Sequence, residues 1–207
     1  MAVLFFAVTT GLSAQNRKYV MWYSPSNAEE VYGVMFNFFP REARFPDYTV
    51  YGVELDLNPL GLFFPIMLVV SGLFEPTMYR PDGNHWDGID SSDYKKTLYG
   101  LHITSLDIEP YIINGLDIAL AGSFQSVVNG AGISLIINKQ DAVNGLTIAP
   151  VGNHNIYCRG VQIGLINTCS DLKGFQIGFW NVNQKRKSPL INWNFKRTVK
   201  KEKKEQQ

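Results

Sequence analysis

The hydrophobic and polar positions of this chain follow a short repeat that runs from Tyr99 to Asn183. Five glycines recur at one fixed interval and a sixth follows one position sooner: Gly100, Gly115, Gly130, Gly145, Gly160 and Gly174. The third residue after each of these glycines is isoleucine, and apolar residues alternate around it, as in Leu116, Ile118 and Leu120. A fixed period indicates a repeat architecture. A hydrophobic period of two is typical of a strand with one buried face.

The alternation predicts which side chains lie inside. We expect one buried stack of isoleucines, formed by Ile118, Ile133, Ile148, Ile163 and Ile177. The residues between them, such as Thr147, are then outward. Apolar residues two positions before the glycines, such as Val143, are out of step with this face. The pattern therefore predicts a corner at each Asn-Gly pair, where a positive φ is tolerated, and a second turn after the strand, as at Asn138-Lys139.

One short strand with two corners cannot bury its apolar face alone, so copies must stack. We predict an all-β fold, a β-solenoid built from units of about 15 residues with capped ends, whose coils lie about 4.8 Å apart. The alternative is an antiparallel β-barrel of the outer-membrane type, because a unit of this length also supplies one membrane-crossing strand and a turn. Antiparallel neighbours are expected to repeat in pairs, and this favours the solenoid.

The chain is predicted to hold a single β-repeat domain over residues 15–195. Its parts are degenerate first units (33–58), an insertion (59–98), the regular repeats (99–183) and a C-terminal cap (184–195). Residues 1–14 form an apolar run that closes on Ser13-Ala14, which predicts a signal peptide and a mature chain beginning at Gln15. Residues 196–207 are rich in lysine and are predicted to be disordered.

Composition changes this picture little. The net charge is +1 and charged residues make up 18% of the chain, so nothing indicates a nucleic-acid partner. The apolar segment 60–70 is too short to span a membrane as a helix, which needs about 20 consecutive apolar residues.

The search for chemistry predicts no catalytic residue, no metal site and no cofactor. The three histidines, His85, His102 and His154, have no partner at ligand or catalytic spacing, and His102 is expected to point outward from a strand. The insertion carries closely spaced oxygen donors, but their order does not fit the EF-hand rule: Asp82, Asn84, Asp87 and Asp90. No enzyme class is indicated.

Two cysteines and one surface complete the candidate residues. Cys158 and Cys169 are the only cysteines, and export would permit a disulfide between them. They do not share a position in the repeat, so buried free thiols are the other interpretation. A binding surface is predicted at Trp86, Gln162 and Gln176, with the insertion as its rim. The alternative is that the insertion only covers an apolar face.

Two repeat units in the C-terminal part of the chain resemble those of a known protein family. They are Gly160-Val-Gln-Ile-Gly-Leu-Ile-Asn and Gly174-Phe-Gln-Ile-Gly-Phe-Trp-Asn, followed by Pro189-Leu-Ile-Asn-Trp. From Tyr32 to Phe195 the chain resembles the surface repeat-containing proteins of spirochaetes and Bacteroidetes. The resemblance implies an exported, envelope-associated protein at the cell surface, the outer membrane or the periplasm, and it implies no enzymatic activity. The expected function is a structural or binding scaffold, whose partner would be an envelope component or a surface ligand, and membrane association stays open. The alternative is an outer-membrane β-barrel protein.

Overall fold

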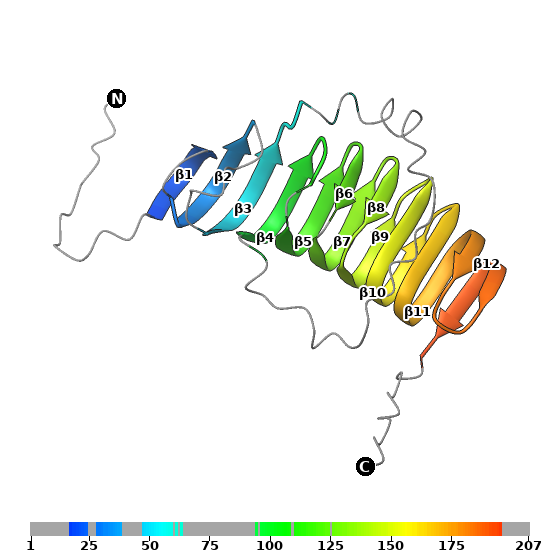
Figure 1. Cartoon of the computed structure of the whole chain (residues 1–207). Coiled ribbons are helices and arrows are strands. Elements are labelled where there is room, and N and C mark those ends of the chain that lie inside the picture. The colour runs from blue at the N-terminus through cyan, green and yellow to red at the C-terminus, as the bar shows by residue number, and fades with distance from the viewer. Residues whose placement is uncertain are drawn as a thin grey trace, which may run out of the picture.

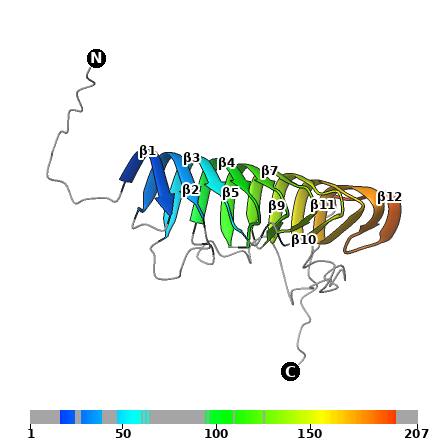
Figure 2. The same cartoon turned by 90° about the horizontal axis from the view of Figure 1, so that it is seen from above.

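The structure is a β-solenoid, an elongated stack of coils in which β1 and β12 lie at opposite ends (Figures 1 and 2). This computed structural model describes residues 17–24, 28–38, 47–59, 61, 63, 94, 96–108, 110–124 and 126–195. The strands are β1 (Arg17–Ser24), β2 (Glu30–Asn37), β3 (Tyr48–Asp56), β4 (Lys96–Thr104), β5 (Tyr111–Ala119), β6 (Gly122–Phe124), β7 (Val127–Ser134), β8 (Ile137–Lys139), β9 (Ala142–Ile148), β10 (Gly152–Ile163), β11 (Ile166–Val182) and β12 (Lys187–Asn194).

The long side of the stack is one sheet in the order β1-β2-β3-β4-β5-β7-β9-β10-β11-β12. All of its neighbours are parallel except β12, which runs antiparallel to β11. The predicted solenoid is confirmed, and the antiparallel alternative is wrong. On the other side of the coil, β6 pairs with β8 and β8 pairs with the start of β10. The interior lies between these two layers.

The repeat glycines lie on one another across the long sheet, as the constant period predicts. Gly130 pairs with Gly145, and Gly145 pairs with Gly160. Each has a positive φ, 138° at Gly145, and a Cβ added there would lie 2.0 Å from the carbonyl oxygen of Gly130. Only glycine lets consecutive coils approach this closely. Val20 occupies the same position in β1, the first strand of the sheet, where no described strand precedes it.

The predicted corner at each Asn-Gly pair is wrong. The strands run straight through the glycine, as β5 does from Tyr111 to Ala119. Residues two before and two after the glycine therefore share one face of the sheet. Ile113 and Asp117 are both fully buried on that face. The chain does bend after the strand, where it passes from the long sheet to the short one, but the bend lies at Leu135-Ile136. The predicted turn at Asn138-Lys139 is wrong, because both residues belong to β8.

The predicted isoleucine stack exists, but it faces outward. Ile118, Ile133, Ile148 and Ile163 are half-buried and Ile177 is exposed. The inward positions beside them are polar and fully buried, with Thr147, Gln162 and Gln176 at 0% exposure. The interior is filled partly by the apolar residues that precede the glycines and partly by polar side chains that pair between coils.

Both ends of the stack are capped, as expected. At the N-terminal end, Trp22 packs against an apolar cluster that includes Val31, Met35 and Val50. At the C-terminal end, β12 covers the last parallel strand. The coils begin earlier than predicted, because β1 already belongs to the sheet, and β4 begins at Lys96, inside the predicted insertion.

Several predictions concern residues that the structure does not describe. These are the signal peptide, the lysine-rich tail, most of the insertion with Trp86 and His85, and its acidic turns. Within the described residues, no helix has the length and apolar character needed to cross a bilayer.

Candidate functional site

The outward side of the long sheet is apolar along its whole length. We call it the apolar face. Its first column lies one position after the repeat glycines and consists of Met21, Val34, Val53, Leu101, Leu116, Ala131, Leu146, Val161, Phe175 and Trp193. Its second column lies two residues further on and consists of Tyr23, Phe36, Leu55, Ile103, Ile118, Ile133, Ile148, Ile163, Ile177 and Ile191. Every position in both columns is apolar or aromatic.

A third column borders this face where the strands bend. Leu120, Leu135 and Leu165 are 53%, 62% and 55% exposed, and Phe179 is also exposed. The three columns span about 13 Å along the strands, and ten described strands at about 4.8 Å spacing extend about 43 Å. The resulting area of about 560 Å² lies at the upper end of the largest apolar patch on a typical monomer, about 300–600 Å².

The opposite border of the apolar face is aromatic, then polar, then basic. The residues directly before the repeat glycines begin with Tyr19, Tyr32, Tyr51 and Tyr99, whose rings stack with centroids 4.8–5.3 Å apart. Asn114, Asn129 and Asn144 follow and are joined by hydrogen bonds, in which Asn129 Nδ2 donates to Asn114 Oδ1 at 2.9 Å. Arg159 and Lys173 complete the column.

Basic and aromatic side chains also gather at the C-terminal end. The Arg186 guanidinium lies 4.0 Å from the centre of the Trp193 ring. Lys185, Arg186, Trp193, Asn194 and Phe195 line an open groove of about 320 Å³. Lys187, which follows Arg186 in the chain, is also exposed.

Gln162 and Gln176 do not form a binding surface, so that prediction is wrong. Gln176 Nε2 donates to Gln162 Oε1 at 2.7 Å, and Asn192 Nδ2 donates to Gln176 Oε1 at 3.1 Å. These side chains hold successive coils together inside the stack. Trp86, the third predicted residue, lies outside the described residues.

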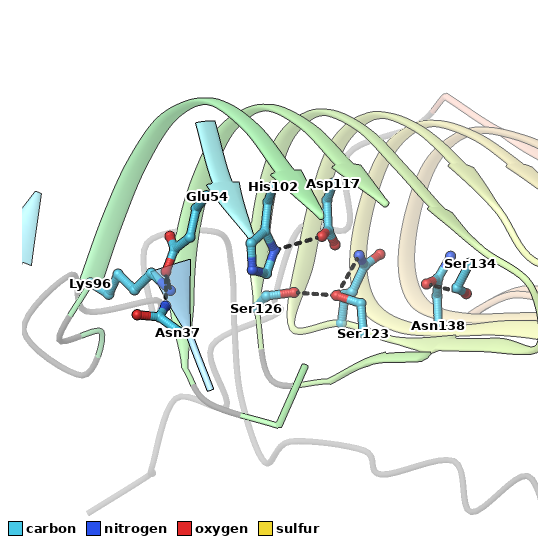
Figure 3. A network of polar contacts seen from close by, with 10 residues as sticks. Asn37, Glu54, Lys96, His102, Asp117, Ser123, Ser126, Ser134 and Asn138 are labelled. Atoms are coloured by element: carbon cyan, nitrogen blue, oxygen red, sulfur yellow. Dashed lines mark hydrogen bonds and ion pairs between the residues drawn. The ribbon is translucent and has the colours of Figure 1, made fainter. Parts of the chain in front are cut away.

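A second chain of amides runs along the short side of the interior. Each asparagine donates to the next across 3.1, 2.9 and 2.8 Å, in the order Asn138, Asn153, Asn167 and Asn181. We call this series the asparagine ladder. Figure 3 shows its first member, with the Ser134 hydroxyl donating to Asn138 Oδ1 at 2.7 Å. An amide buried without a partner costs about 1–3 kcal/mol, so pairing between coils makes a polar interior tolerable.

The coils of β3 to β5 hold charged side chains instead of amides. Lys96 is buried and forms an ion pair with Glu54, which also accepts a hydrogen bond from Asn37 (Figure 3). The Lys96 ammonium lies 3.6 Å from the centre of the Tyr111 ring. Burial by itself would lower the pKa of Lys96, but the charge of Glu54 outweighs it and holds that pKa above its usual value.

His102 is not on the outer surface, which corrects the sequence prediction. Its Nδ1 lies 2.9 Å from Asp117 Oδ1, and both side chains point into the interior (Figure 3). His102, Asp117 and Asp107 each place a potential ligand atom within 4.8 Å of the others. Burial opposes the charged imidazole, but the hydrogen bond to Asp117 raises the His102 pKa overall. Burial raises the pKa of Asp107 well above its usual range.

The repeat itself could have revealed the first of these contacts. His102 and Asp117 are separated by one full repeat in the sequence, and they pair directly between β4 and β5. Asp107 carries no such signal, because it reaches the pair from the opposite layer, where it bridges to Ser123.

Cys158 and Cys169 are free thiols in the structure and both are buried. As expected from the period they do not pair directly, since Cys158 lies opposite Leu172 and Cys169 lies opposite Asn155. Burial raises the pKa of the Cys169 thiol well above its usual value, and the hydrogen bond with Cys158 raises it further. Of the two interpretations of these cysteines, buried free thiols are confirmed and the disulfide is not formed.

Comparison with known proteins finds no matching family model, no matching curated protein and no matching solved structure. The resemblance to surface repeat-containing proteins therefore stays a prediction that rests on the residues of this chain.

Proposed function

We propose that this protein is an exported, non-enzymatic scaffold of the cell envelope that lies on a lipid surface through its apolar face. The apolar face itself carries the proposal. Its two inner columns are apolar or aromatic across all ten strands that the structure describes in the long sheet. At about 25 cal/mol per Å², covering about 560 Å² of apolar surface contributes up to about 14 kcal/mol before ordering costs.

The borders of the face favour lipid as the surface that covers it. Tyrosine and tryptophan are enriched where membrane meets water, because their rings are apolar and their polar tips reach water. The tyrosine column occupies such a border here, and Trp193 lies in β12 at the C-terminal end of the face. Arg159, Lys173, Lys185, Arg186 and Lys187 place cations around the C-terminal half, where they would meet anionic headgroups.

Two further observations support a scaffold without catalysis. The interior amides bond coil to coil, so the stack presents its outer residues on a rigid repeating frame. Among the described residues, histidine and carboxylate groups come together at His102. They lie buried between the two layers, where a dissolved substrate does not reach them. The predicted signal peptide that ends at Ser13-Ala14 and the resemblance to envelope proteins support the location.

Vesicle flotation tests the proposal on the chain from Gln15 onward. The protein should float with anionic vesicles and, more weakly, with neutral ones. The triple variant Leu120→Gln, Leu135→Gln and Leu165→Gln removes exposed apolar area without changing charge and should lose binding to both. The double variant Lys185→Gln and Lys187→Gln should lose only the salt-sensitive part.

Lys139→Gln is the matched control, because Lys139 is exposed on the short side of the coil, away from the apolar face. It should float like the unchanged protein. A protein that does not float, or a triple variant that floats fully, would contradict the proposal. If the unchanged protein instead sediments as a dimer and the triple variant as a monomer, a second copy covers the face and the lipid proposal fails.

A further inference from the structure

The interior of the β3–β5 coils carries unbalanced charge. Among the described residues, the buried carboxylate, ammonium and imidazole groups all lie there: Glu54, Asp56, Lys96, His102, Asp107 and Asp117. Four carboxylates thus share this buried interior with one ammonium and one imidazole. From β7 onward, the corresponding positions hold neutral residues such as Thr147, Gln162 and Asn153. Buried charge is costly unless it is paired or bound to a metal ion. An additional positive charge would therefore stabilise this region.

Three donors converge at one point of that interior. His102 and Asp117 reach it from the long sheet and Asp107 from the opposite layer, with their ligand atoms within 4.8 Å of one another. The His102 Nε2 atom and the Asp117 Oδ2 atom are buried and have no hydrogen-bond partner within the described part of the chain. Thr104, two residues after His102 on the same inward face, also has a buried hydroxyl without a partner there.

His102 and Asp117 already place two possible ligand atoms side by side. His102 Nδ1 lies 2.9 Å from Asp117 Oδ1, close to the separation of two neighbouring ligands at Zn–N and Zn–O distances of about 2.0–2.2 Å. An ion bound here would take the imidazole through Nδ1, in place of the proton that otherwise joins the two atoms.

The position of Asp107 is also distinctive. It pairs with Ser123, which pairs with Asn138 at the start of the asparagine ladder. In this column of the short side, the next coil carries a hydroxyl and the later coils carry amides that hydrogen-bond to one another. The first coil of the column carries a carboxylate instead, and this carboxylate faces His102 and Asp117. A bound cation would do in this coil what amide pairing does in the later ones.

We propose that His102, Asp107 and Asp117 bind a divalent transition-metal ion of the Zn²⁺ type, which joins the two layers of the N-terminal coils. An imidazole with two carboxylates suits Zn²⁺ and its first-row neighbours, whereas Mg²⁺ and Ca²⁺ favour sets made only of oxygen. Two positive charges would offset the excess of carboxylates. This site is independent of the apolar face, so either proposal can fail alone.

The competing way to neutralise the cluster is a proton on Asp107, whose pKa burial already raises. The chain offers a clean experiment because it has only three histidines. In the double variant His85→Gln and His154→Gln, His102 is the only imidazole left and all three proposed ligands are intact. This protein, stripped of metal and labelled with ¹⁵N at histidine, is titrated with Zn²⁺ while imidazole nitrogen resonances and thermal unfolding are followed.

We expect one equivalent of Zn²⁺ to bind, the His102 Nδ1 resonance to move, and the unfolding temperature to rise. Asp117→Asn in the same background should weaken binding by at least about 10–100-fold, because it removes a ligand and loss of a merely supporting group already costs that much. Thr147→Val, in the same inward column two coils away, should leave Zn²⁺ affinity unchanged.

Binding that leaves the imidazole resonances in place would assign the zinc to other groups, such as Cys158 and Cys169, and would overturn the proposal. So would a protein that binds no Zn²⁺, or an Asp117→Asn variant of unchanged affinity. If Asp117→Asn does not fold, the resonance test on the double variant decides alone, because its ligand set is complete.

Discussion

Replacing Thr147 and Ile148 in turn by valine tests the orientation of the strands. The two residues are neighbours in β9 and lie on opposite faces. Both are β-branched, and valine keeps that branching, so strand propensity changes little. Thr147→Val replaces one hydroxyl in the interior by a methyl group. Ile148→Val removes only one methylene from the apolar face.

The contacts in the structure predict different losses of stability for the two substitutions. Thr147 Oγ1 accepts a hydrogen bond from Asn138 Nδ2 at 2.9 Å and can donate to Asn153 Oδ1 at 2.9 Å. Asn138 keeps other acceptors in the variant, the Asn153 side chain and the Ile148 carbonyl, so its N–H groups are not stranded. Each lost hydrogen bond costs about 0.5–1.5 kcal/mol, so for these two bonds we expect Thr147→Val to cost about 2 kcal/mol.

Ile148→Val should cost much less. At a fully buried site this change costs about 0.5–1.5 kcal/mol. Ile148 is half-buried, so we expect about 0.5 kcal/mol or less. Urea unfolding without lipid, followed by circular dichroism, measures both values, and equal m-values would show that both variants unfold from similarly compact states. An inward isoleucine stack would reverse the order, so a greater loss at Ile148 than at Thr147 would refute the orientation.

Three further predictions concern other parts of the chain. Gly145→Ala should cost more than about 3 kcal/mol, because alanine there combines a strained positive φ with a backbone clash; Gly132→Ala, which meets only the end of a glutamine side chain, should cost much less in the same urea assay. Burial lowers the pKa of His154 in the folded protein below its value in the unfolded chain. As pH drops below about 6.5, the unfolded chain therefore binds a proton at this residue more readily than the folded protein, and stability should fall. His154→Gln should flatten this dependence between about pH 7 and about pH 5, and an unchanged slope would contradict the prediction. Mass spectrometry of the exported protein should show Gln15 at its N-terminus, and retention of Met1 would overturn the predicted signal peptide.

The period of the sequence was sufficient to predict the solenoid. Identical residues one period apart must lie on one another, and the glycine pairing from Gly100 to Gly160 bears this out. The period did not decide which face is inside, because the repeat carries two apolar sets on opposite faces. One set, with Val143, precedes the glycine, and the other, with Ile148, follows it. A predicted corner at the glycine placed both sets inside. The structure keeps the strand straight and places the second set outside.

The polar interior was hard to predict for a related reason. A hydropathy pattern predicts that a glutamine faces solvent, because burying a single amide without a partner is costly. In a stack, the partner that satisfies Gln162 is Gln176, the same position one coil later. The same reasoning applied to His102 and Asp117 would have placed them together. Asp107 joins them across the coil, and no spacing along the chain indicates that contact.

The outward orientation of the apolar face and its lipid contact can be tested together by cysteine labelling. The two native thiols are buried and should react slowly. In the folded protein, Ile148→Cys should react quickly with a water-soluble thiol reagent, and Thr147→Cys should not. Adding anionic vesicles should then protect Ile148→Cys. Faster labelling of Thr147→Cys, or no protection of Ile148→Cys by vesicles that bind the protein, would contradict this account.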